Sequence, residues 1–442
     1  MALFSSSPTR RSLLIGAAPA AFALTCSLSP RARADNAPLI VVTSFPEELT
    51  TRYEREFERR YPEAHVQFVW KHSRDALALL SGPDQGGVDV YWAPSPNFPL
   101  LRDQGALRPI AVDRAVLPGR VGNQPLSDPS GTYEAYDLAG YGFALNPSLL
   151  RERGLPEPKS WGDLASPIFA DQIVAPVPSK VGFAPALYDV ILQAEGWERG
   201  WAIVSELVAN ARLVAHGRGP TASVEESEAP IGLTIDFLAL SARANGAPIA
   251  FAYPARTAFL PSNIAVTSST RKFDTAKAFV DFVLSCDGQK ILLEADSVRH
   301  PARPDAYRRT GSEALINPFD LRSENIFDYD FDLGRHRPGI VRALFDIAFA
   351  TRHAEVTSLW RSIHDAETRL GNATGREAER IAEARRLAGS VPVSTRQADR
   401  AEYLAQFAGR DAPDAEILER WNAELAASRA TAMALLHAPL PG

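Results

Sequence analysis

The stretch that decides the fold is residues 39–70, LIVVTSFPEELTTRYEREFERRYPEAHVQFVW. Its first part, Leu39–Thr43, is a short continuous apolar run that predicts a buried strand. In Glu47–Arg60 the apolar residues recur every four positions, which predicts a surface helix, and His65–Trp70 predicts the next strand. Strands that alternate with helices form a parallel sheet with helices on its faces, so we expect an α/β fold.

The same pattern continues along the chain. A helix capped by Ser73 is predicted to run through Leu80, and a third strand is predicted at Val88–Trp92. A second block has predicted strands at 141–145, 173–177, 231–234, 249–253 and 264–267, and predicted helices at 182–193, 197–209 and 274–284. Strand signals cease near residue 302, and residues 340–436 are predicted to be mostly helical.

The composition narrows the classes of protein that the chain can belong to. It has 442 residues, of which 45% are hydrophobic and 23% charged, with a net charge of −6 and two cysteines. This is globular composition with room for two or three domains, and it excludes disorder of the whole chain. Two cysteines cannot build a disulfide framework or a cysteine zinc cluster, and the acidic total disfavours nucleic acid as a partner.

The first 34 residues have the three parts of a secretory signal peptide. Arg10 and Arg11 precede an apolar stretch that runs to Leu24, and Ala32–Ala34 has the small residues of a cleavage site. We therefore expect cleavage after Ala34 and a periplasmic protein. The paired arginines are typical of twin-arginine export as well as of the general route, so both stay open.

Cleavage changes the charge and the cysteine count of the mature protein. The signal contains four arginines and no acidic residue, so its removal takes the net charge from −6 to about −10. Lipidation at Cys26 is the less favoured alternative, because Thr25 stands where a small residue is expected. With Cys26 removed, Cys286 is the only cysteine and no internal disulfide can form.

Ligands of open α/β sheets bind outside the carboxyl ends of the strands. We therefore expect a site at the loops Thr43–Ser44, Lys71–Ser73 and Ala93–Ser95. The chain has only six lysines against forty-one arginines, and Lys71 and Lys180 each precede a predicted helix, whose N-terminus favours an anion. We hypothesise that an anionic solute is held by Ser44, Lys71, His72, Ser73, Ser179, Lys180 and Gly182.

Alternatives to this site stay open. Ser73 and Ser179 are equally typical of helix caps or turns, and both lysines of ordinary solvated side chains. The loop His216–Thr221 has two glycines and is a candidate anion nest or an ordinary turn. Asp236 is a candidate acceptor for a ligand hydroxyl, although a helix cap is favoured. The remaining candidates are Ser95, Tyr141, Arg218, Thr221, Thr234, Asp236 and Tyr253, with Arg256 as a further cation.

Several short strings, in this order, are similar to those of one protein family. They are Val41–Pro46, Trp161–Leu164, Pro178–Gly182, Ala229–Gly232, Gly246–Ile249 with Tyr253–Pro254, and Ala276–Phe282 with Gly288–Lys290. Together they resemble extracellular solute-binding proteins of the ferric-iron and phosphorylated-solute group, over residues 36 to 300. The resemblance implies a type II periplasmic binding protein fold, with two α/β lobes joined by two crossing strands that close on a solute.

The resemblance also implies limits for the lobes and partners for the protein. The crossings would fall near 139–141, with Gly140 as a pivot, and near 251–253. Lobe 1 would comprise 35–140 and 251–300, lobe 2 would comprise 141–250, and 301–442 would be a helical extension. A partner would be an ABC permease or a membrane sensor kinase, and we expect a monomer. The extension is a candidate sensor-docking surface, but a cap packed on lobe 1 is favoured.

Metal-binding and enzymatic functions are less favoured. Members of the family that hold ferric ion commonly use adjacent tyrosines, and this chain has no Tyr-Tyr pair. It also lacks a Gly-x-Ser-x-Gly elbow, a His-Glu-x-x-His motif and a phosphate loop. We therefore expect neither a catalytic residue nor a cofactor, and a small anionic, phosphorylated organic solute as the ligand.

Overall fold

The computed structural model describes residues 37–94, 96–121, 124–216, 218–294, 298–307, 315–321, 327–371, 374–409 and 413–437. The predicted signal peptide and the candidate Ser95 lie outside the described residues. No helix in the described ranges has the length and apolar character needed to cross a membrane.

Lobe 1 is built on three parallel strands and one antiparallel strand. Strands β1 (Leu39–Thr43), β2 (Val66–Trp70) and β3 (Val90–Ala93) are parallel, and β12 (Phe259–Thr267) runs antiparallel beside β3. Its helices are α1 (Glu47–Arg60), α2 (Ser73–Leu80), α3 (Asn97–Asp103), α9 (Phe273–Val283) and α10 (Cys286–Ile291). The apolar face of α1, with Leu49, Tyr53 and Phe57, is fully buried as its spacing predicts.

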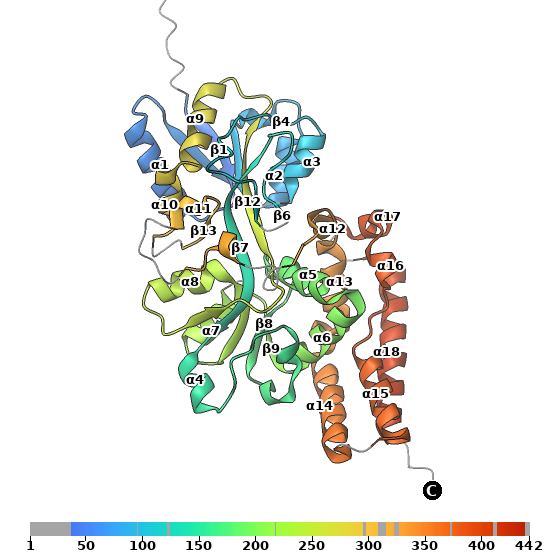
Figure 1. The fold of residues 1–442 in the computed structure, drawn as a ribbon. Coiled ribbons are helices and arrows are strands. Elements are labelled where there is room, and N and C mark those ends of the chain that lie inside the picture. The colour runs from blue at the N-terminus through green and yellow to red at the C-terminus, as the bar shows by residue number, and fades with distance from the viewer. Residues whose placement is uncertain are drawn as a thin grey trace, which may run out of the picture. The chain divides into compact units, whose positions relative to one another are not determined.

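The strand that joins the lobes is β7 (Glu134–Leu145), and Figure 1 shows it running from one lobe into the other. Residues 134–140 pair with β12 of lobe 1, and residues 141–145 pair with β10 (Ile231–Ile235) of lobe 2. The change of pairing partner falls between Gly140 and Tyr141, within the stretch where the crossing was expected. The strand starts seven residues before the predicted Tyr141, because its buried Glu134 and Asp137 interrupt the apolar pattern.

The chain returns to lobe 1 just after the predicted position. Strand β11 (Ala250–Ala252) still pairs with residues 143–145 of β7, whereas β12 begins beside Gly140. The return therefore lies between residues 253 and 258. A short strand β13 (His300–Pro301) then pairs with Asp137 and Leu138 of β7 and adds a third segment at the junction.

Lobe 2 continues the same sheet in the order β7-β10-β8-β9. Strands β8 (Ile173–Pro176) and β9 (Ala211–Val214) are parallel to β10. Its helices are α4 (Pro147–Glu152), α5 (Ala184–Glu195), α6 (Trp197–Ala209), α7 (Gly219–Glu225) and α8 (Asp236–Ala244). The remaining short elements are β4 (Leu107–Arg108), β5 (Arg120–Val121), β6 (Gln124–Pro125) and α11 (Pro304–Tyr307).

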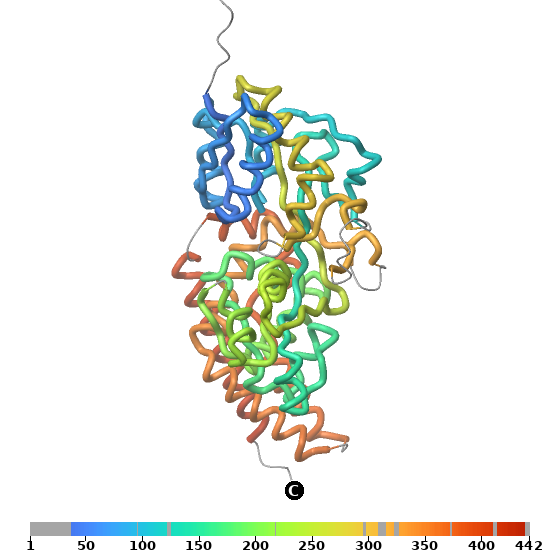
Figure 2. Tube along the Cα trace, turned by 90° about the vertical axis from the view of Figure 1, so that its left-hand side faces the viewer, coloured from blue at the N-terminus to red at the C-terminus, as the bar shows by residue number. Residues whose placement is uncertain are grey.

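The C-terminal extension is helical and packs on lobe 2, so the expected cap on lobe 1 is wrong. Its helices are α12 (Phe331–His336), α13 (Pro338–Ala348), α14 (His353–Leu370), α15 (Arg376–Ala388), α16 (Thr395–Ala398), α17 (Ala401–Leu404) and α18 (Ala415–His437). Figures 1 and 2 show these orange and red helices beside the green helices of lobe 2. Trp201 of α6, Phe345 of α13 and Trp360 of α14 lie in one continuous core.

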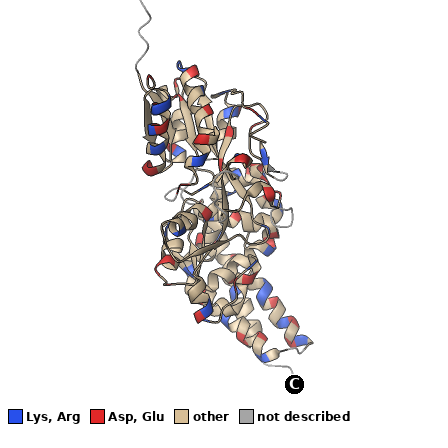
Figure 3. Ribbon diagram, turned by 60° about the vertical axis from the view of Figure 1, so that its left-hand side comes forward, with Lys and Arg blue, Asp and Glu red and all other residues tan. Residues whose placement is uncertain are grey.

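Hydrogen bonds and an ion pair fix the extension to lobe 2. The Trp197 indole donates to the Val393 carbonyl at 2.7 Å, and the Trp360 indole donates to Ser205 Oγ at 2.9 Å. The buried Arg337 pairs with Asp189 of α5 at 3.2 Å. Along the helices of the extension arginines alternate with Asp and Glu, as the blue and red segments of the ribbon in Figure 3 show. This mixture is typical of a solvated helix face.

Candidate functional site

The strand directions make the carboxyl ends of both lobes face each other. Strand β7 runs from lobe 1 to lobe 2, and β1, β2 and β3 are parallel to it, because β12 is antiparallel to both β3 and β7. Strands β8, β9 and β10 run the opposite way, because β10 is antiparallel to β7. The loops after β1, β2 and β3 therefore face the loops after β8, β9 and β10.

On lobe 1 the candidate residues lie in two adjoining loops. The backbone N–H of Lys71 donates to the Thr43 carbonyl at 2.8 Å, which holds the loop after β2 against the end of β1. Ser44 and Lys71 are half-buried and His72 is exposed. The His72 ring lies against the exposed Trp70 indole, with centroids 4.5 Å apart in an edge-to-face arrangement.

The prediction that Ser73 caps α2 is wrong. The residue at the N-cap is His72, which makes no side-chain capping bond, and Ser73 is the first helical residue. The Ser73 carbonyl accepts from Asn97 Nδ2 at 2.6 Å, which joins α2 to the start of α3. The sequence pattern located the helix correctly but not its cap, because serine is common at both positions.

On lobe 2 the loop after β8 differs from the expectation. Helix α5 begins at Ala184, with Pro185 in its first turn, rather than at Gly182. Lys180 and Gly182 are exposed, whereas the Ser179 hydroxyl donates to Asp346 Oδ1 of the extension at 2.9 Å. An anion that uses Ser179 would therefore meet a carboxylate already bonded there.

The loop after β9 places its candidates in two different environments. Arg218 is exposed at the start of α7, and its guanidinium lies 3.5 Å from the Glu225 carboxylate. Thr221 and Thr234 are buried, and their hydroxyl oxygens lie 3.0 Å apart in a hydrogen bond. This pair joins α7 to β10, so both hydroxyls act inside lobe 2 and not on its surface.

Asp236 is the centre of the junction between the lobes. Its carboxylate is fully buried, and Oδ2 accepts from the Gly140 N–H at 2.6 Å and from Tyr253 Oη at 3.0 Å. Nε2 of His300 lies 3.3 Å from the same oxygen and 2.6 Å from Tyr253 Oη. The helix-cap interpretation is wrong, because the N-cap of α8 is Ile235 and Asp236 is the first helical residue.

The two tyrosines among the candidates support this junction. Burial raises the pKa of Tyr253 well above its usual value, and the Asp236 carboxylate raises it further. Burial also raises the pKa of Tyr141, whose backbone carbonyl accepts from Thr257 Oγ1 at 2.7 Å. Gly140 is required here by close packing, because a Cβ at that position would lie 2.5 Å from the Tyr253 ring. Both phenols therefore stay neutral, and the Tyr253 hydroxyl is part of the junction between the lobes.

The sequence pattern missed Arg299 and His300. Arg299 is buried, pairs with Asp137 of β7 at 3.0 Å, and its guanidinium carbon lies 3.9 Å from the Phe237 ring of α8. The same guanidinium lies 5.2 Å from the Phe45 ring in the loop after β1. Arg299 therefore touches both lobes beside two candidates, Ser44 and Asp236. No local motif precedes it, so only the tertiary structure shows its position.

Within the described ranges, no group of three His, Cys, Asp or Glu side chains is placed to hold a metal ion. Arg256 is exposed and has a positive φ of 61° in the return segment. The candidates thus separate into a surface set (Ser44, Lys71, His72, Lys180, Gly182, Arg218) and a set used inside the protein (Ser73, Tyr141, Ser179, Thr221, Thr234, Asp236, Tyr253).

The fold, its two facing edges and its crossing strand are those of a periplasmic binding protein. The sequence profile of the family described as bacterial extracellular solute-binding protein matches residues 98–317, and this match confirms the resemblance to solute-binding proteins that the sequence showed. The lobes of this chain form the two-lobed type II fold that the resemblance implied.

Particular relatives are similar to this chain. The phosphoglycerate transport regulatory protein PgtC of Salmonella typhimurium is 28% identical over 292 residues, which are 65% of this chain and 70% of that protein. The fold matches that of the periplasmic binding protein AfuA from Actinobacillus pleuropneumoniae, solved with fructose-6-phosphate, with a TM-score of 0.57 and 20% identity over 70% of this chain and 97% of that one. It also matches iron-bound HitA from Pseudomonas aeruginosa, with a TM-score of 0.54 and 18% identity over 69% and 96%.

Proposed function

We propose that this protein captures a small anionic, phosphorylated organic solute between its lobes in the periplasm and delivers it to an ABC importer. The observation that carries the proposal is that Lys71 and Lys180, on the facing edges of the two lobes, form no ion pair with a carboxylate of the described residues. Lys272, Lys277 and Lys290, which lie elsewhere in lobe 1, each pair with a carboxylate, whereas Lys159 of lobe 2 has none within 4 Å among the described residues. Among the described residues no carboxylate lies within 4 Å of the ammonium of Lys71 or Lys180.

The surroundings of these lysines support an anion as the ligand. Lys71 is half-buried before the N-terminus of α2, and Lys180 is exposed before that of α5. A helix N-terminus carries unpaired N–H groups and the positive end of the helix dipole. His72 and His216 are exposed on the same two edges and add donors. Fructose-6-phosphate in AfuA and the phosphoglycerate in the name of PgtC make a phosphorylated solute the first class to test.

A thermal-shift panel, followed by calorimetry, tests the proposal. It compares 3-phosphoglycerate, fructose-6-phosphate, inorganic phosphate, a dicarboxylate and Fe³⁺, with glycerate and fructose as matched ligands that lack the phosphate. A ligand at one hundred times its Kd adds about 2.7 kcal/mol to the free energy of unfolding. We expect a shift with a phosphorylated compound and none with its unphosphorylated partner. A shift with Fe³⁺ alone contradicts the proposal.

The contribution of the lysines is tested on the ligand that the panel finds. Replacing Lys71 or Lys180 with alanine is expected to weaken binding by about tenfold each, because each removes one charge-assisted contact of about 1.5 kcal/mol. Lys277→Ala removes the same charge from an exposed i,i+4 pair on α9 and is the control. If Lys71→Ala and Lys180→Ala both bind the ligand with unchanged affinity, neither lysine contacts it.

A sensory role is the second candidate, because the extension gives the protein a helical surface beyond its two lobes. In this role the solute-loaded protein would bind a membrane sensor kinase rather than a permease. The two roles are separated by measuring which membrane partner responds to the loaded protein, by ATP hydrolysis of the permease or by autophosphorylation of the kinase.

Mass spectrometry of the exported protein tests the predicted cleavage after Ala34. The residue limits of the lobes stay a prediction.

A further inference from the structure

The extension places a carboxylate against the lobe 2 loop that follows β8. Asp346 lies on α13, which packs beside α5, and Ser179 Oγ donates to its Oδ1 at 2.9 Å. The charged groups that act on this carboxylate are Lys180, from the same loop, and Arg342, one turn earlier on α13. Ser179 and Lys180 are the residues through which an anionic solute would be held on lobe 2. Asp346 is therefore bonded where that anion would bind.

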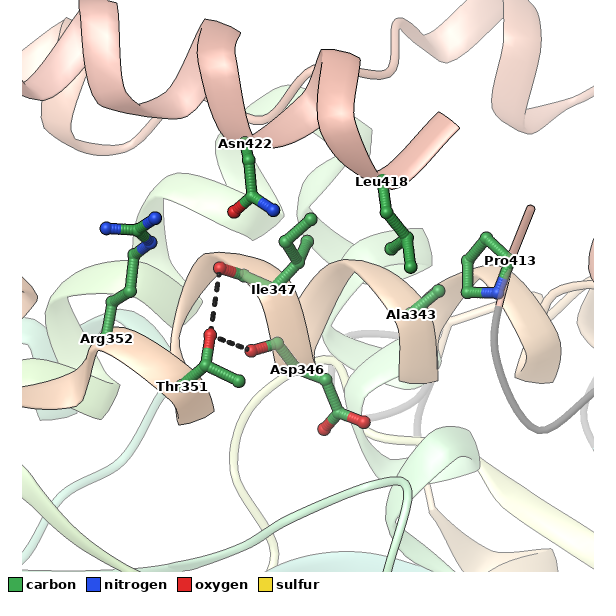
Figure 4. A pocket seen from close by; sticks show the side chains of 8 residues that line it. All are labelled: Ala343, Asp346, Ile347, Thr351, Arg352, Pro413, Leu418 and Asn422. Carbon is green, nitrogen blue, oxygen red and sulfur yellow. Dashed lines mark hydrogen bonds between the residues drawn. The ribbon is translucent and has the colours of Figure 1, made fainter. Parts of the chain in front are cut away.

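No charged side chain of α18 that lines the cavity beside α13 competes with Ser179 for the Asp346 carboxylate. Helices α13 and α18 line a cavity of about 500 Å³, shown in Figure 4, into which α18 presents only the uncharged Leu418 and Asn422. Asp346 lines the same cavity, and in Figure 4 its carboxylate extends away from Leu418 and Asn422. Arg352 also lines the cavity, but its guanidinium pairs with Glu355 at 3.4 Å. The Asp346 carboxylate thus takes its hydrogen bond from Ser179, in the loop that follows β8.

We propose that Asp346 is an internal competitor for the anionic solute, with its carboxylate taking the place of the ligand's anion beside Ser179 and Lys180 until the solute displaces it. The inference rests on the proposed function and goes beyond it, because it makes the extension part of the binding equilibrium. A solute then binds with its intrinsic affinity reduced by the fraction of molecules in which the competitor is bound.

The protonation of Asp346 makes the affinity for the anionic solute depend on pH. Burial raises the pKa of Asp346 above its usual value, against the opposing effects of the Ser179 hydrogen bond, Lys180 and Arg342. The carboxylate therefore loses its charge at a higher pH than an exposed aspartate does. As the pH falls through that raised pKa, Asp346 becomes neutral and competes less with the anion. The affinity of the wild-type protein for an anion then approaches that of a variant without the carboxylate.

The test compares Asp346→Asn with the wild-type protein by calorimetry at pH 7.5, using 3-phosphoglycerate, fructose-6-phosphate and inorganic phosphate as probes. Asparagine keeps an oxygen that accepts from Ser179 but removes the charge. We expect the variant to bind about tenfold more tightly, an effect that lies between those of a unit charge about 5 Å from the ligand in bulk water and near a protein surface. Asp365→Asn, on an exposed position of α14, removes the same charge from the extension and should leave the affinity unchanged.

A second measurement uses the ratio of the wild-type Kd to the variant Kd between pH 7.5 and 5. The ratio cancels every pH dependence that the two proteins share, including that of the probe, and we expect it to fall toward one as the pH decreases. Asp346→Ala, checked for folding by circular dichroism, replaces Asp346→Asn if that variant does not fold. Equal or weaker binding in the charge-removed variant, while wild type binds an anion, overturns this inference alone. Failure of every anion to bind both proteins overturns the proposed function together with it.

Discussion

Replacing Asp236 with asparagine is the sharpest test of how the two lobes are held together. The carboxylate is fully buried and accepts three hydrogen bonds, from the N–H groups of Gly140 and Phe237 and from Tyr253 Oη. Asparagine has the same shape but only one oxygen. Its amide N–H₂ must therefore face either the Phe237 N–H or the donors Gly140 N–H and Tyr253 Oη. The substitution therefore removes at least one charge-assisted bond and leaves a buried donor opposed by another donor.

The expected loss of stability follows from these contacts. A hydrogen bond to a charged group contributes about 1.5–3 kcal/mol, and a buried group left without a partner costs about 1–3 kcal/mol. We therefore expect the free energy of unfolding to fall by about 3 kcal/mol. With an unfolding entropy of about 2.1 cal/mol/K per residue over the whole mature chain, this corresponds to a Tm lower by about 4 °C.

Urea unfolding followed by tryptophan fluorescence, together with a calorimetric Tm, measures this loss. The matched control is Asp274→Asn, since Asp274 is an exposed carboxylate in the first turn of α9, as Asp236 is in the first turn of α8. The control loses the favourable contact with the helix dipole, about 0.5 kcal/mol, and nothing else. If the two variants have the same Tm, Asp236 does not hold the junction and the reasoning is refuted.

Three further predictions concern other parts of the protein. Asp128 is buried, yet hydrogen bonds from Ser130, Thr132 and Arg102 outweigh that burial and lower its pKa to about 2. Asp128→Asn should therefore cost about 2 kcal/mol at pH 7, a difference that disappears as the pH falls from about 4 to 2 and that urea unfolding at each pH measures. Phe237→Ala removes the lobe 2 ring from the Arg299 guanidinium, so X-ray scattering of the unliganded variant should show a larger radius of gyration; an unchanged radius contradicts a lobe-bridging role. A chain truncated after residue 326 should be insoluble, because it exposes the apolar faces of α5 and α6; a soluble monomer with native circular dichroism would contradict the shared core.

Much of this fold follows from local patterns. The helix from Trp197 to Ala209 begins and ends at the predicted residues, and α2 ends at the predicted Leu80 and begins one residue before its predicted start, because apolar spacing and flanking residues are local signals. Strand β7 was predicted too short for a physical reason. Glu134 pairs with Arg114, twenty residues away, and Asp137 pairs with Arg299, 162 residues away. Charged residues buried with distant partners look like loop residues in a local pattern.

The candidate site was predictable only where it depends on strand ends. The carboxyl-end rule located the loops of Ser44, Lys71 and Lys180, since it needs only the order of strands and helices. Whether a hydroxyl or carboxylate in those loops is free depends on what packs against it. Thr221 bonds to Thr234, Asp236 to the hinge and Ser179 to the extension, and none of these partners is adjacent in the sequence.

The attachment of the extension decides how its carboxylate can leave the site. Helix α13 shares a core with α5 and α6 and is tied to lobe 2 by the buried pair of Arg337 with Asp189, so we expect it to move with lobe 2 in the closure that the proposed function requires. Closure alone therefore cannot separate Asp346 from Ser179, because both residues ride on the same rigid body. Only a solute that offers a better anion, or protonation of Asp346, releases the loop. Binding should accordingly respond to the charge of Asp346 in the open and closed states alike.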